Sequence, residues 1–301
     1  MLVREIAKVR ELVSEWKKQG LTVGLVPTMG SLHNGHLSLI KRSVEKCDKT
    51  VVSVFVNPIQ FGPSEDYSKY PRVIDKDMEL CDNAGVDIVF SPSPEEMYGK
   101  GNVLSNNYLT FVNPPFFYVD KLCGKSRVGH FEGVCTVVSK LFNIVQPNFA
   151  FFGQKDAQQL VIIKKMVKDL NFPLEIIPCP IVREESGLAL SSRNAYFSEE
   201  GKKNALALSK VLKNIQNCYK QGITDTKALS ETAFDILNKN VELEYLEFVD
   251  KDNLENKTVA DSNTMVLIAG RVKGLVTVGA NENEPFTPEN SVRLIDNCFI
   301  N

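Results

Sequence analysis

Two of the three histidines of this 301-residue chain lie three residues apart in Pro27–His36, which reads PTMGSLHNGH. His33 and His36 would share one face of a helical turn, because residues i and i+3 are neighbours on a helix surface. The segment joins an expected strand to an expected helix, and a helix start offers unpaired amides and partial positive charge to a phosphate. Gly30 and Gly35 let the backbone approach a ligand closely. The spacing favours a polyphosphate site whose charged imidazoles offset the negative charge that grows in a transition state.

Two other interpretations of the histidine pair stay open at this point. The segment could be a capped turn with two exposed histidines, or it could hold a metal ion. Zinc pairs on helices usually combine i, i+4 histidines with a nearby glutamate, and this segment lacks that arrangement. We therefore expect phosphate chemistry and no protein-bound metal.

Neutral amides follow the second expected strand, in Phe55–Gly62 (FVNPIQFG). Pro58 ends the strand, so Asn57 and Gln60 lie at the carboxyl end of that strand. Amides can bind a hydroxyl and a carboxylate without neutralising the carboxylate. An ordinary turn explains this segment equally well.

A lysine begins the expected helix in Phe151–Gln159 (FFGQKDAQQ). The placement of Lys155 opposes the helix dipole, which makes sense if an anion binds there. Asp156 could be a helix cap, or it could face a ribose or a metal. Gln159 lies four residues after Lys155 and would share its face.

Hydroxyls and an arginine meet in Val182–Asn194 (VREESGLALSSRN), at the expected domain boundary. Ser191 and Ser192 beside Arg193 could clamp a phosphate, and a hinge loop there could close over a nucleotide. A polar linker is the alternative. His130 precedes another expected helix and is compatible with a cap, a surface histidine or an anion-facing loop.

Alternating strands and helices must position these segments. Apolar and β-branched runs predict strands at 21–27, 50–56, 86–90, 149–152 and 174–178, and helices near 6–16, 35–47, 73–84, 133–145 and 155–170. This alternation predicts an α/β fold with a doubly wound parallel (Rossmann-like) sheet over residues 1–182. Ligands of such sheets bind beyond the carboxyl ends of the strands.

After residue 183 the pattern changes from alternating strands and helices to long helices followed by short strands. This change predicts a smaller α+β domain over 183–301. We expect helices near 198–221 and 226–239, a loop at Asn281–Asn290, and strands near Glu242–Val249, Met265–Ala269 and Leu275–Val278.

Composition excludes several classes of protein. The net charge of −2 argues against binding to nucleic acid or to an anionic membrane surface. The 43% of hydrophobic residues argues against a disordered chain. The sequence has no run of 18 apolar residues, so we expect no membrane span. Acidic residues near the N-terminus argue against a targeting signal. Seven cysteines without a C-x-x-C spacing predict reduced thiols and a cytoplasmic location.

Five motifs follow one another in the order of a known family: PTMG-x-LH-x-GH, FVNP-x-QF, GHF-x-GV-x-TVV-x-KL, FG-x-KD-x-QQ and LSSRN, with a terminal RLIDN at Arg293–Asn297. From the first strand to its end, the chain resembles the pantothenate synthetases, also called pantoate–β-alanine ligases. These belong to the nucleotidyltransferases with a His-x-Gly-His motif. The resemblance implies that pantoate and MgATP form pantoyl adenylate and pyrophosphate, and that β-alanine then displaces AMP. It also implies a homodimer.

The resemblance further assigns residues to roles. Catalytic roles would fall to His36 as the proton donor, with His33, Lys155 and Arg193. Gln60 would contact pantoate and β-alanine, Gln159 would hold pantoate, and Asn57 would lie with them. The implied ATP-binding residues are Pro27, Met29, Gly30, Ser31, Leu32, His33, Asn34, Gly35, His36, Gly153, Gln154, Lys155, Asp156, Val182, Leu190, Ser191, Ser192 and Arg193. Because the pantoate carboxylate can itself attack the α-phosphate, no protein nucleophile is needed.

Three departures from the family pattern stand out. Val128 replaces a common proline before His130, Gln154 replaces a common glutamate, and the stretch 275–290 is longer than usual. Three rival functions stay open: a cytidylyltransferase-like enzyme of the same fold, a nucleotide-binding protein without activity, and a three-histidine zinc hydrolase.

Overall fold

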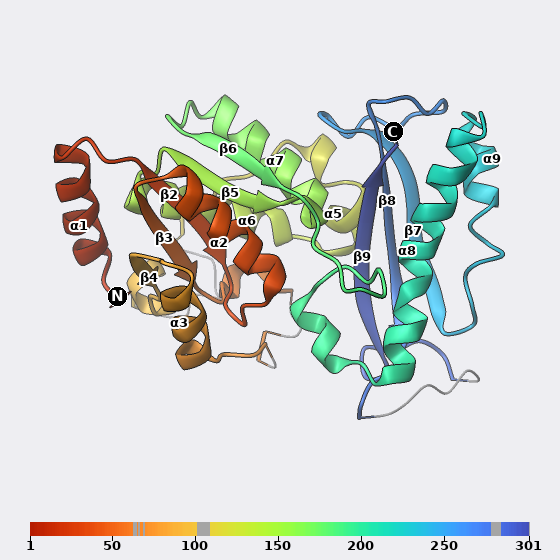
Figure 1. Cartoon of the computed structure of the whole chain (residues 1–301), viewed down its shortest axis with the longest axis horizontal. Helices are drawn as coiled ribbons and strands as arrows, with labels where there is room; N and C mark the ends of the chain where they lie inside the picture. Colours follow the sequence, from red (N-terminus) through yellow and green to blue (C-terminus); the bar gives the residue numbers. More distant parts are fainter. Residues whose placement is uncertain (63–64, 66, 69, 101–108, 278–283, 301) are drawn as a thin grey trace. The chain divides into compact units, whose positions relative to one another are not determined.

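A parallel six-stranded sheet forms the first part of the chain in the computed structural model (Figure 1). The structure describes residues 1–62, 65, 67–68, 70–100, 109–277 and 284–300. Two units separate within it, Met1–Gln154 with Gln158–Pro180, and Lys155–Ala157 with the chain from Ile181 onward. Each unit is described by itself.

The strand order in the first unit is β1-β4-β3-β2-β5-β6, and every neighbouring pair is parallel. Such a sheet is covered on both faces, so its strands are apolar and β-branched along their length; in β3 both Val51 and Val52 are fully buried. The predicted strands are confirmed, and β1 is an addition. The bounds are β1 Leu2–Val3, β2 Val23–Thr28, β3 Lys49–Val54, β4 Ile88–Phe90, β5 Phe149–Gly153 and β6 Glu175–Cys179.

Helices connect these strands and cover the sheet. The longer ones are α1 Ile6–Lys18, α2 Asn34–Lys46, α3 Ile74–Asn83, α6 His130–Val145 and α7 Ala157–Asp169. Shorter turns are η1 Pro58–Gln60, α4 Pro94–Tyr98, η3 Phe116–Tyr118, α5 Leu122–Ser126 and η4 Gln154–Asp156. Helix α2 lies so close to β2 that a Cβ on Gly24 would overlap the hydroxyl of Ser43, so glycine is required there.

The strand order reverses between β2 and β5. From β2 the chain moves through α2 to β3 on one side, whereas from β5 it moves through α7 to β6 on the other. Crossovers of constant right-handedness that run in opposite directions place their helices on opposite faces of the sheet. The carboxyl ends of β2 and β5 therefore border the crevice in which doubly wound sheets bind ligands.

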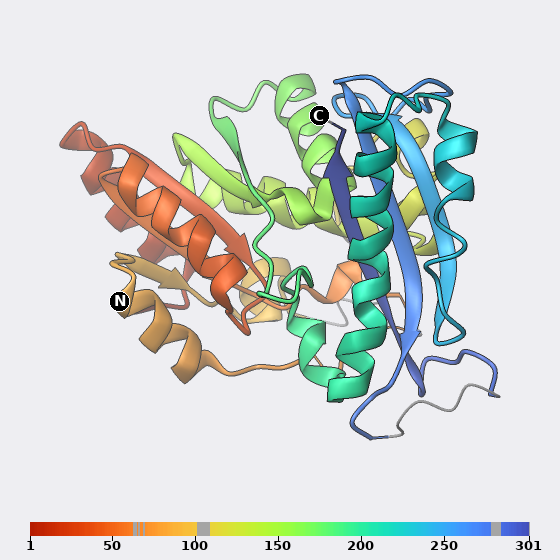
Figure 2. The same ribbon diagram turned by 45° about the vertical axis from the view of Figure 1, so that its right-hand side comes forward.

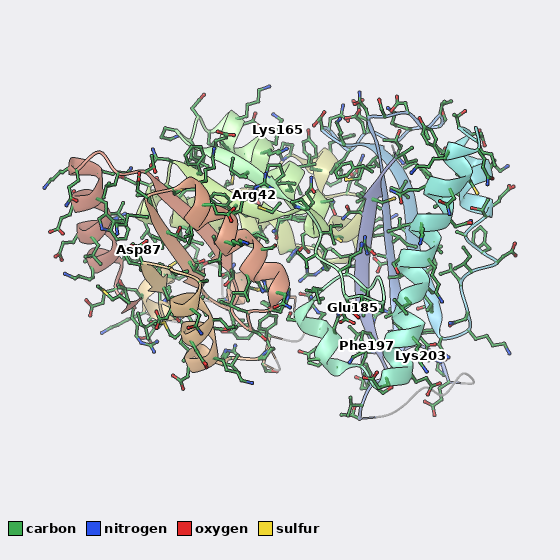
Figure 3. The ribbon with its side chains drawn as sticks, viewed as in Figure 1. Arg42, Asp87, Lys165, Glu185, Phe197 and Lys203 are labelled. Atoms are coloured by element: carbon green, nitrogen blue, oxygen red, sulfur yellow. The ribbon has the colours of Figure 1, made fainter. Side chains whose placement is uncertain are left out.

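The second unit contains an antiparallel sheet with the order β7-β8-β9, whose bounds are β7 Val241–Asp250, β8 Thr264–Lys273 and β9 Ser291–Phe299. Figure 2 shows α8 (Glu199–Lys220) running along this sheet, and its buried side chains share a core with those of β8. Phe197, labelled in Figure 3, is 3% exposed in that core. The remaining elements are η5 Ser192–Tyr196 and α9 Thr226–Glu231.

The predicted fold class is confirmed, but the second unit corrects two details. The strand expected at Leu275–Val278 is wrong over the described residues, because Leu275 makes an isolated bridge with Phe197 and 276–277 form a turn. Val278 lies outside the described residues. The third strand is instead β9, which carries the RLIDN motif, and α9 ends at Glu231, well before the expected position at 239.

Candidate active site

A buried carboxylate shapes the loop that follows β2. Gly30 and Ser31 have φ angles of 81° and 52°, so two successive residues are left-handed. Asp77 of α3 is 0% exposed. Its carboxylate accepts hydrogen bonds from the backbone amides of Ser31, at 2.9 Å, and Leu32, at 2.8 Å. These two hydrogen bonds stabilise a backbone that a non-glycine residue seldom adopts. Sequence reasoning missed Asp77, because an acid in a helix's first turn has an ordinary explanation in the dipole.

The next residues of the loop place both histidines at the start of α2. His33 is the N-cap, and its Nδ1 accepts the amide of Gly35 at 3.1 Å. Nδ1 of His36 accepts the amide of His33 at 3.4 Å, and the ring centroids are 4.1 Å apart. A ring that accepts at Nδ1 is neutral and carries its proton at Nε2, so both rings can donate from Nε2. This corrects the expectation of charged imidazoles. The turn is capped, as one alternative proposed, but the histidines are half-buried rather than exposed.

We expect Asp77 to make stability depend on pH. Burial raises the pKa of Asp77 above its usual range, against the lowering effect of the Leu32 and Ser31 amides. Between the ordinary pKa of about 3.9 and the raised value, the folded state therefore binds more protons than the unfolded state. The free energy of unfolding should fall as pH rises through that interval, when compared with Asp77→Asn, which does not titrate.

Urea unfolding of both proteins from about pH 4 to about pH 7 measures this difference. Asp75→Asn, on an exposed position of the same helix, controls for the change in charge. A difference between wild type and Asp77→Asn that stays flat or rises with pH would contradict the expectation.

Neutral amides lie at the carboxyl end of β3, as the sequence predicts, and the structure shows how they are oriented. The carbonyl of Gly133 accepts from Asn57 Nδ2 at 3.2 Å, and Tyr98 donates its hydroxyl to Asn57 Oδ1 at 2.7 Å. Burial raises the pKa of Tyr98, which keeps its phenol protonated as a donor. Asn57 Nδ2 also donates to Gln60 Oε1 at 3.0 Å.

This arrangement leaves the amide nitrogen of Gln60 for other acceptors. Gln60 Nε2 lies 3.2 Å from the thioether of Met29, which is a weak acceptor. Gln60 is 8% exposed, so a ligand carboxylate or hydroxyl that reached Nε2 would replace a weak hydrogen bond with a stronger one. The structure thus brings together Met29, Asn57 and Gln60, all of which the sequence predicted as site residues.

Helix α6 approaches η1 closely at Gly133. A Cβ there would lie 2.5 Å from the carbonyl oxygen of Ile59 and 2.6 Å from the Cα of Gln60. Because those neighbours are backbone atoms, Gly133→Ala should force α6 and η1 apart and lower the free energy of unfolding by about 1–3 kcal/mol. Thermal and urea unfolding would measure it. Gly62→Ala is the control, since its Cβ would meet only Glu65 carbons at 3.7 Å or more; equal losses in both variants would contradict the close-packing argument.

The β5 end and α7 carry the next predicted residues. Gly153 ends β5, Gln154 begins η4, and both are half-buried. Gln159 is half-buried in α7. The neighbouring Gln158 makes hydrogen bonds to a distant loop: its Nε2 donates to the carbonyls of Tyr118 and Lys121 at 2.7 and 3.0 Å. Gln158 therefore anchors a loop, and the role of Gln159 stays a prediction.

The second unit contains the remaining predicted residues. Lys155 has its carbonyl held by Asn297 Nδ2 at 2.9 Å, and its ammonium lies 3.9 Å from the exposed Asp156. Asp296, next to Asn297 in β9, accepts two hydrogen bonds from Arg183, at 2.7 and 2.9 Å. The terminal motif thus holds the backbone of Lys155 and the side chain of Arg183, the residue after Val182.

The serine loop is held within the same unit. Leu190 donates its amide to the carbonyl of Val182 at 3.0 Å, and Ser191 caps η5 through the amide of Arg193 at 3.3 Å. Ser192 and Arg193 are half-buried in that turn. In the first unit, Pro27, Asn34 and Gly35 lie at the end of β2 and in the first turn of α2.

Each of the seven cysteines is a free thiol, and five of them are buried. Burial raises the pKa of Cys81 and Cys135 to about 12, so these thiols stay protonated and unreactive at neutral pH.

Among the residues that the structure describes, no group of three or more His, Cys, Asp or Glu side chains could hold a metal ion. Over the same residues, none of the helices combines the length and the apolar character that a membrane span requires.

Comparison with known proteins gives consistent matches. The family model described as "Pantoate-beta-alanine ligase" matches residues 1–299. The pantothenate synthetase of Clostridium novyi (strain NT) is 52% identical over 269 residues, which cover 89% of this chain and 93% of that protein.

Solved structures agree with the sequence matches. The pantothenate synthetase from Thermus thermophilus has a TM-score of 0.86 at 39% identity, over 99% of both chains. The pantoate–β-alanine ligase from Francisella tularensis, complexed with β,γ-ATP and β-alanine, has a TM-score of 0.75 at 31% identity, over 99% of this chain and 97% of that one.

Proposed function

Because the chain belongs to the pantoate–β-alanine ligase family, we propose that it condenses (R)-pantoate with β-alanine to pantothenate at the expense of ATP. Pantoyl adenylate is the intermediate, and pyrophosphate and AMP are released. The observation that carries the proposal is the family match over residues 1–299, which includes the histidine loop, the Asn57–Gln60 turn and the serine loop.

In the first step, a pantoate carboxylate oxygen attacks the α-phosphorus of ATP, and the bond from that phosphorus to the pyrophosphate oxygen breaks. Gln60 and Gln159 bind pantoate through neutral amides, so the carboxylate keeps its charge and its nucleophilicity. Holding the two reactants in line contributes on the order of 7–11 kcal/mol toward lowering the barrier. His33, His36, Lys155 and Arg193 offset the charge that develops on the leaving pyrophosphate.

Neutral imidazoles with Nε2 protons suit this role, and the capping bonds to Nδ1 of His33 and His36 support that tautomer. His36 donates a hydrogen bond, or its proton, to the phosphate oxygens as the bond to pyrophosphate breaks. Mg²⁺ arrives with ATP as part of the substrate, since Mg²⁺ commonly binds phosphate oxygens and few protein carboxylates.

In the second step, the amine of β-alanine attacks the acyl carbon of the mixed anhydride, the new C–N bond forms, and AMP leaves with the electrons of the broken C–O bond. The amine loses a proton as the amide forms. Gln60 contacts both pantoate and β-alanine, so the acyl acceptor arrives beside the bound adenylate. The β-alanine in the Francisella complex supports binding of this substrate by the family's fold.

Several further roles belong to the same proposal. The residues implied to bind ATP do so from the β2 loop, the β5 end, Val182 and the stretch from Leu190 to Arg193. The protein is a cytoplasmic homodimer; cysteines without disulfides agree with a reducing compartment.

A product assay tests the proposal directly. The full-length protein is incubated with ATP, Mg²⁺, pantoate and β-alanine, and AMP and pantothenate are quantified. Pantoate-dependent exchange of labelled pyrophosphate into ATP isolates the first step. A folded protein that shows neither activity would sink the proposal, and turnover of a phosphorylated substrate without pantoate would favour a cytidylyltransferase-like enzyme.

A further inference from the structure

Three side chains outside the proposed mechanism form a chain of hydrogen bonds that ends on the backbone of Gln60. Glu65 follows η1, Arg127 follows α5, and His130 is the first residue of α6. The Arg127 guanidinium makes two hydrogen bonds to Glu65, with Nε at 2.7 Å and Nη2 at 2.8 Å from the carboxylate oxygens. Arg127 Nη1 lies 2.8 Å from His130 Nε2, and His130 Nδ1 lies 2.9 Å from the carbonyl oxygen of Gln60.

The partners at both ring nitrogens determine the protonation of His130. A guanidinium only donates, so Nε2 of His130 must accept from Arg127. A backbone carbonyl only accepts, so Nδ1 must carry the proton and donate to Gln60. The arrangement therefore requires a neutral imidazole in the Nδ1–H tautomer, which is the opposite of the tautomer at His33 and His36.

Glu65 and Arg127, the first two members of this hydrogen-bonded series, both stay charged near neutral pH. Burial alone would raise the pKa of Glu65, but the hydrogen bonds and charge of Arg127 outweigh it and lower that pKa. Glu65 stays ionised and holds the guanidinium in a bidentate geometry, which fixes its orientation better than a single contact does. His130 is 8% exposed, so few competing hydrogen bonds from water reach the ring.

Helix α6 therefore holds η1 at two points one turn apart. His130 binds the Gln60 carbonyl, and Gly133, three residues on, packs against Ile59 and the backbone of Gln60. Residues i and i+3 lie on one helix face, so both contacts act on the same side of η1. Gln60 is the last residue of this three-residue turn, whose own backbone hydrogen bonds are long: Gln60 N to Asn57 O at 3.5 Å and Phe61 N to Pro58 O at 3.3 Å.

We propose that His130 is a positioning residue for Gln60: its Nδ1–H fixes the Gln60 carbonyl, Arg127 fixes the tautomer, and Glu65 fixes Arg127. The inference rests on the proposed role of Gln60 in binding pantoate and β-alanine. Fixing the backbone directs the Gln60 amide at the hydroxy-acid carboxylate or hydroxyl. A misplacement of about 1 Å can lower a rate on the order of 10²-fold.

The tautomer gives a test that does not depend on activity. With three histidines in the chain, histidine-selective ¹⁵N labelling yields three ring systems, and His130→Asn identifies the one that belongs to residue 130. We expect wild-type His130 to be neutral with its proton on Nδ1. Arg127→Met should shift that proton toward Nε2. A ring protonated on Nε2, or on both nitrogens, at neutral pH in the wild type would overturn the proposal.

Kinetics test the positioning role itself. His130→Leu removes the donor, and we expect the KM for pantoate to rise about tenfold or more while the KM for ATP changes by less than about threefold. His130→Asn places an amide N–H near the position of Nδ1 and should recover most of the pantoate affinity. If His130→Leu does not fold, Arg127→Met provides the same comparison. An unchanged pantoate KM in a folded His130→Leu or Arg127→Met protein would overturn the inference.

Gln60→Ala separates this inference from the proposed function. If Gln60 binds pantoate, Gln60→Ala raises the pantoate KM, and adding His130→Leu has little further effect, because both act through one side chain. Full additivity of the two changes would overturn the positioning role and leave the ligase activity standing. An unchanged pantoate KM in Gln60→Ala would reject both the role of Gln60 and the inference, while product formation would still support the ligase.

Discussion

Replacement of His36 by alanine should lower turnover about 10²–10³-fold while the protein remains folded, because a preorganised donor to developing phosphate charge is lost. The structural cost is small. His36 Nδ1 accepts one amide, that of His33, at a long 3.4 Å, and removal of a capping acceptor costs about 1 kcal/mol. The loop keeps its two hydrogen bonds to Asp77.

Two matched variants separate capping from chemistry at this position. His36→Asn retains an acceptor near the position of Nδ1 but lacks a donor near Nε2, so stability should be restored while turnover stays low. His36→Gln places its amide nitrogen near the position of Nε2 and should recover part of the turnover. Pyrophosphate exchange and pantothenate formation measure activity, and thermal unfolding measures stability. Near-normal turnover in His36→Ala would remove His36 from the mechanism.

Lys155→Met should lower the rate of adenylate formation by about 10²-fold or more. The change removes a cation that the proposal places against the phosphates, and a methionine keeps the length and apolar contacts of the stem. The fold should be unaffected, since the lysine's weak ion pair with Asp156 spans 3.9 Å and its backbone carbonyl keeps the hydrogen bond from Asn297. Lys155→Arg retains the charge in a different shape and should give an intermediate rate.

Lys165→Met is the matched control for this prediction. Lys165, labelled in Figure 3, is in α7 and forms an ion pair with Asp169 one turn away. The control variant loses the same charge, yet its exchange activity should stay near that of the wild type. Equal losses in both variants would point to a general electrostatic effect and against a specific role of Lys155.

Much of the sheet could be predicted because its signal is local. Strands buried on both faces must be apolar along their whole length, as in β3, and each such run is visible without knowledge of its neighbours. The strand β9 shows the limit. Its buried and half-buried positions include the polar residues Arg293, Asp296 and Asn297. Its sequence therefore resembles a polar segment until its pairing with β8 is known.

The site shows the same division. The histidine loop, the Asn57–Gln60 turn and the lysine at residue 155 each combine distinctive residue types in a short segment, and five such segments in order were enough to predict the family. The residues that hold the site in shape come from far along the chain. Asp77 is 46 residues from Ser31, and Glu65 is 62 residues from Arg127.

The sequence by itself therefore determined the family, the doubly wound parallel sheet and the side chains proposed to meet the substrates, because each depends on residue type and local spacing. Only the tertiary structure decided which residues orient those side chains. Asp77 with the β2 loop, Tyr98 with Asn57, and the Gln60 backbone with His130 all act through hydrogen bonds between segments that chain folding brings together. Hydrogen bonds require contact within about 3 Å, and sequence separation carries no information about that distance.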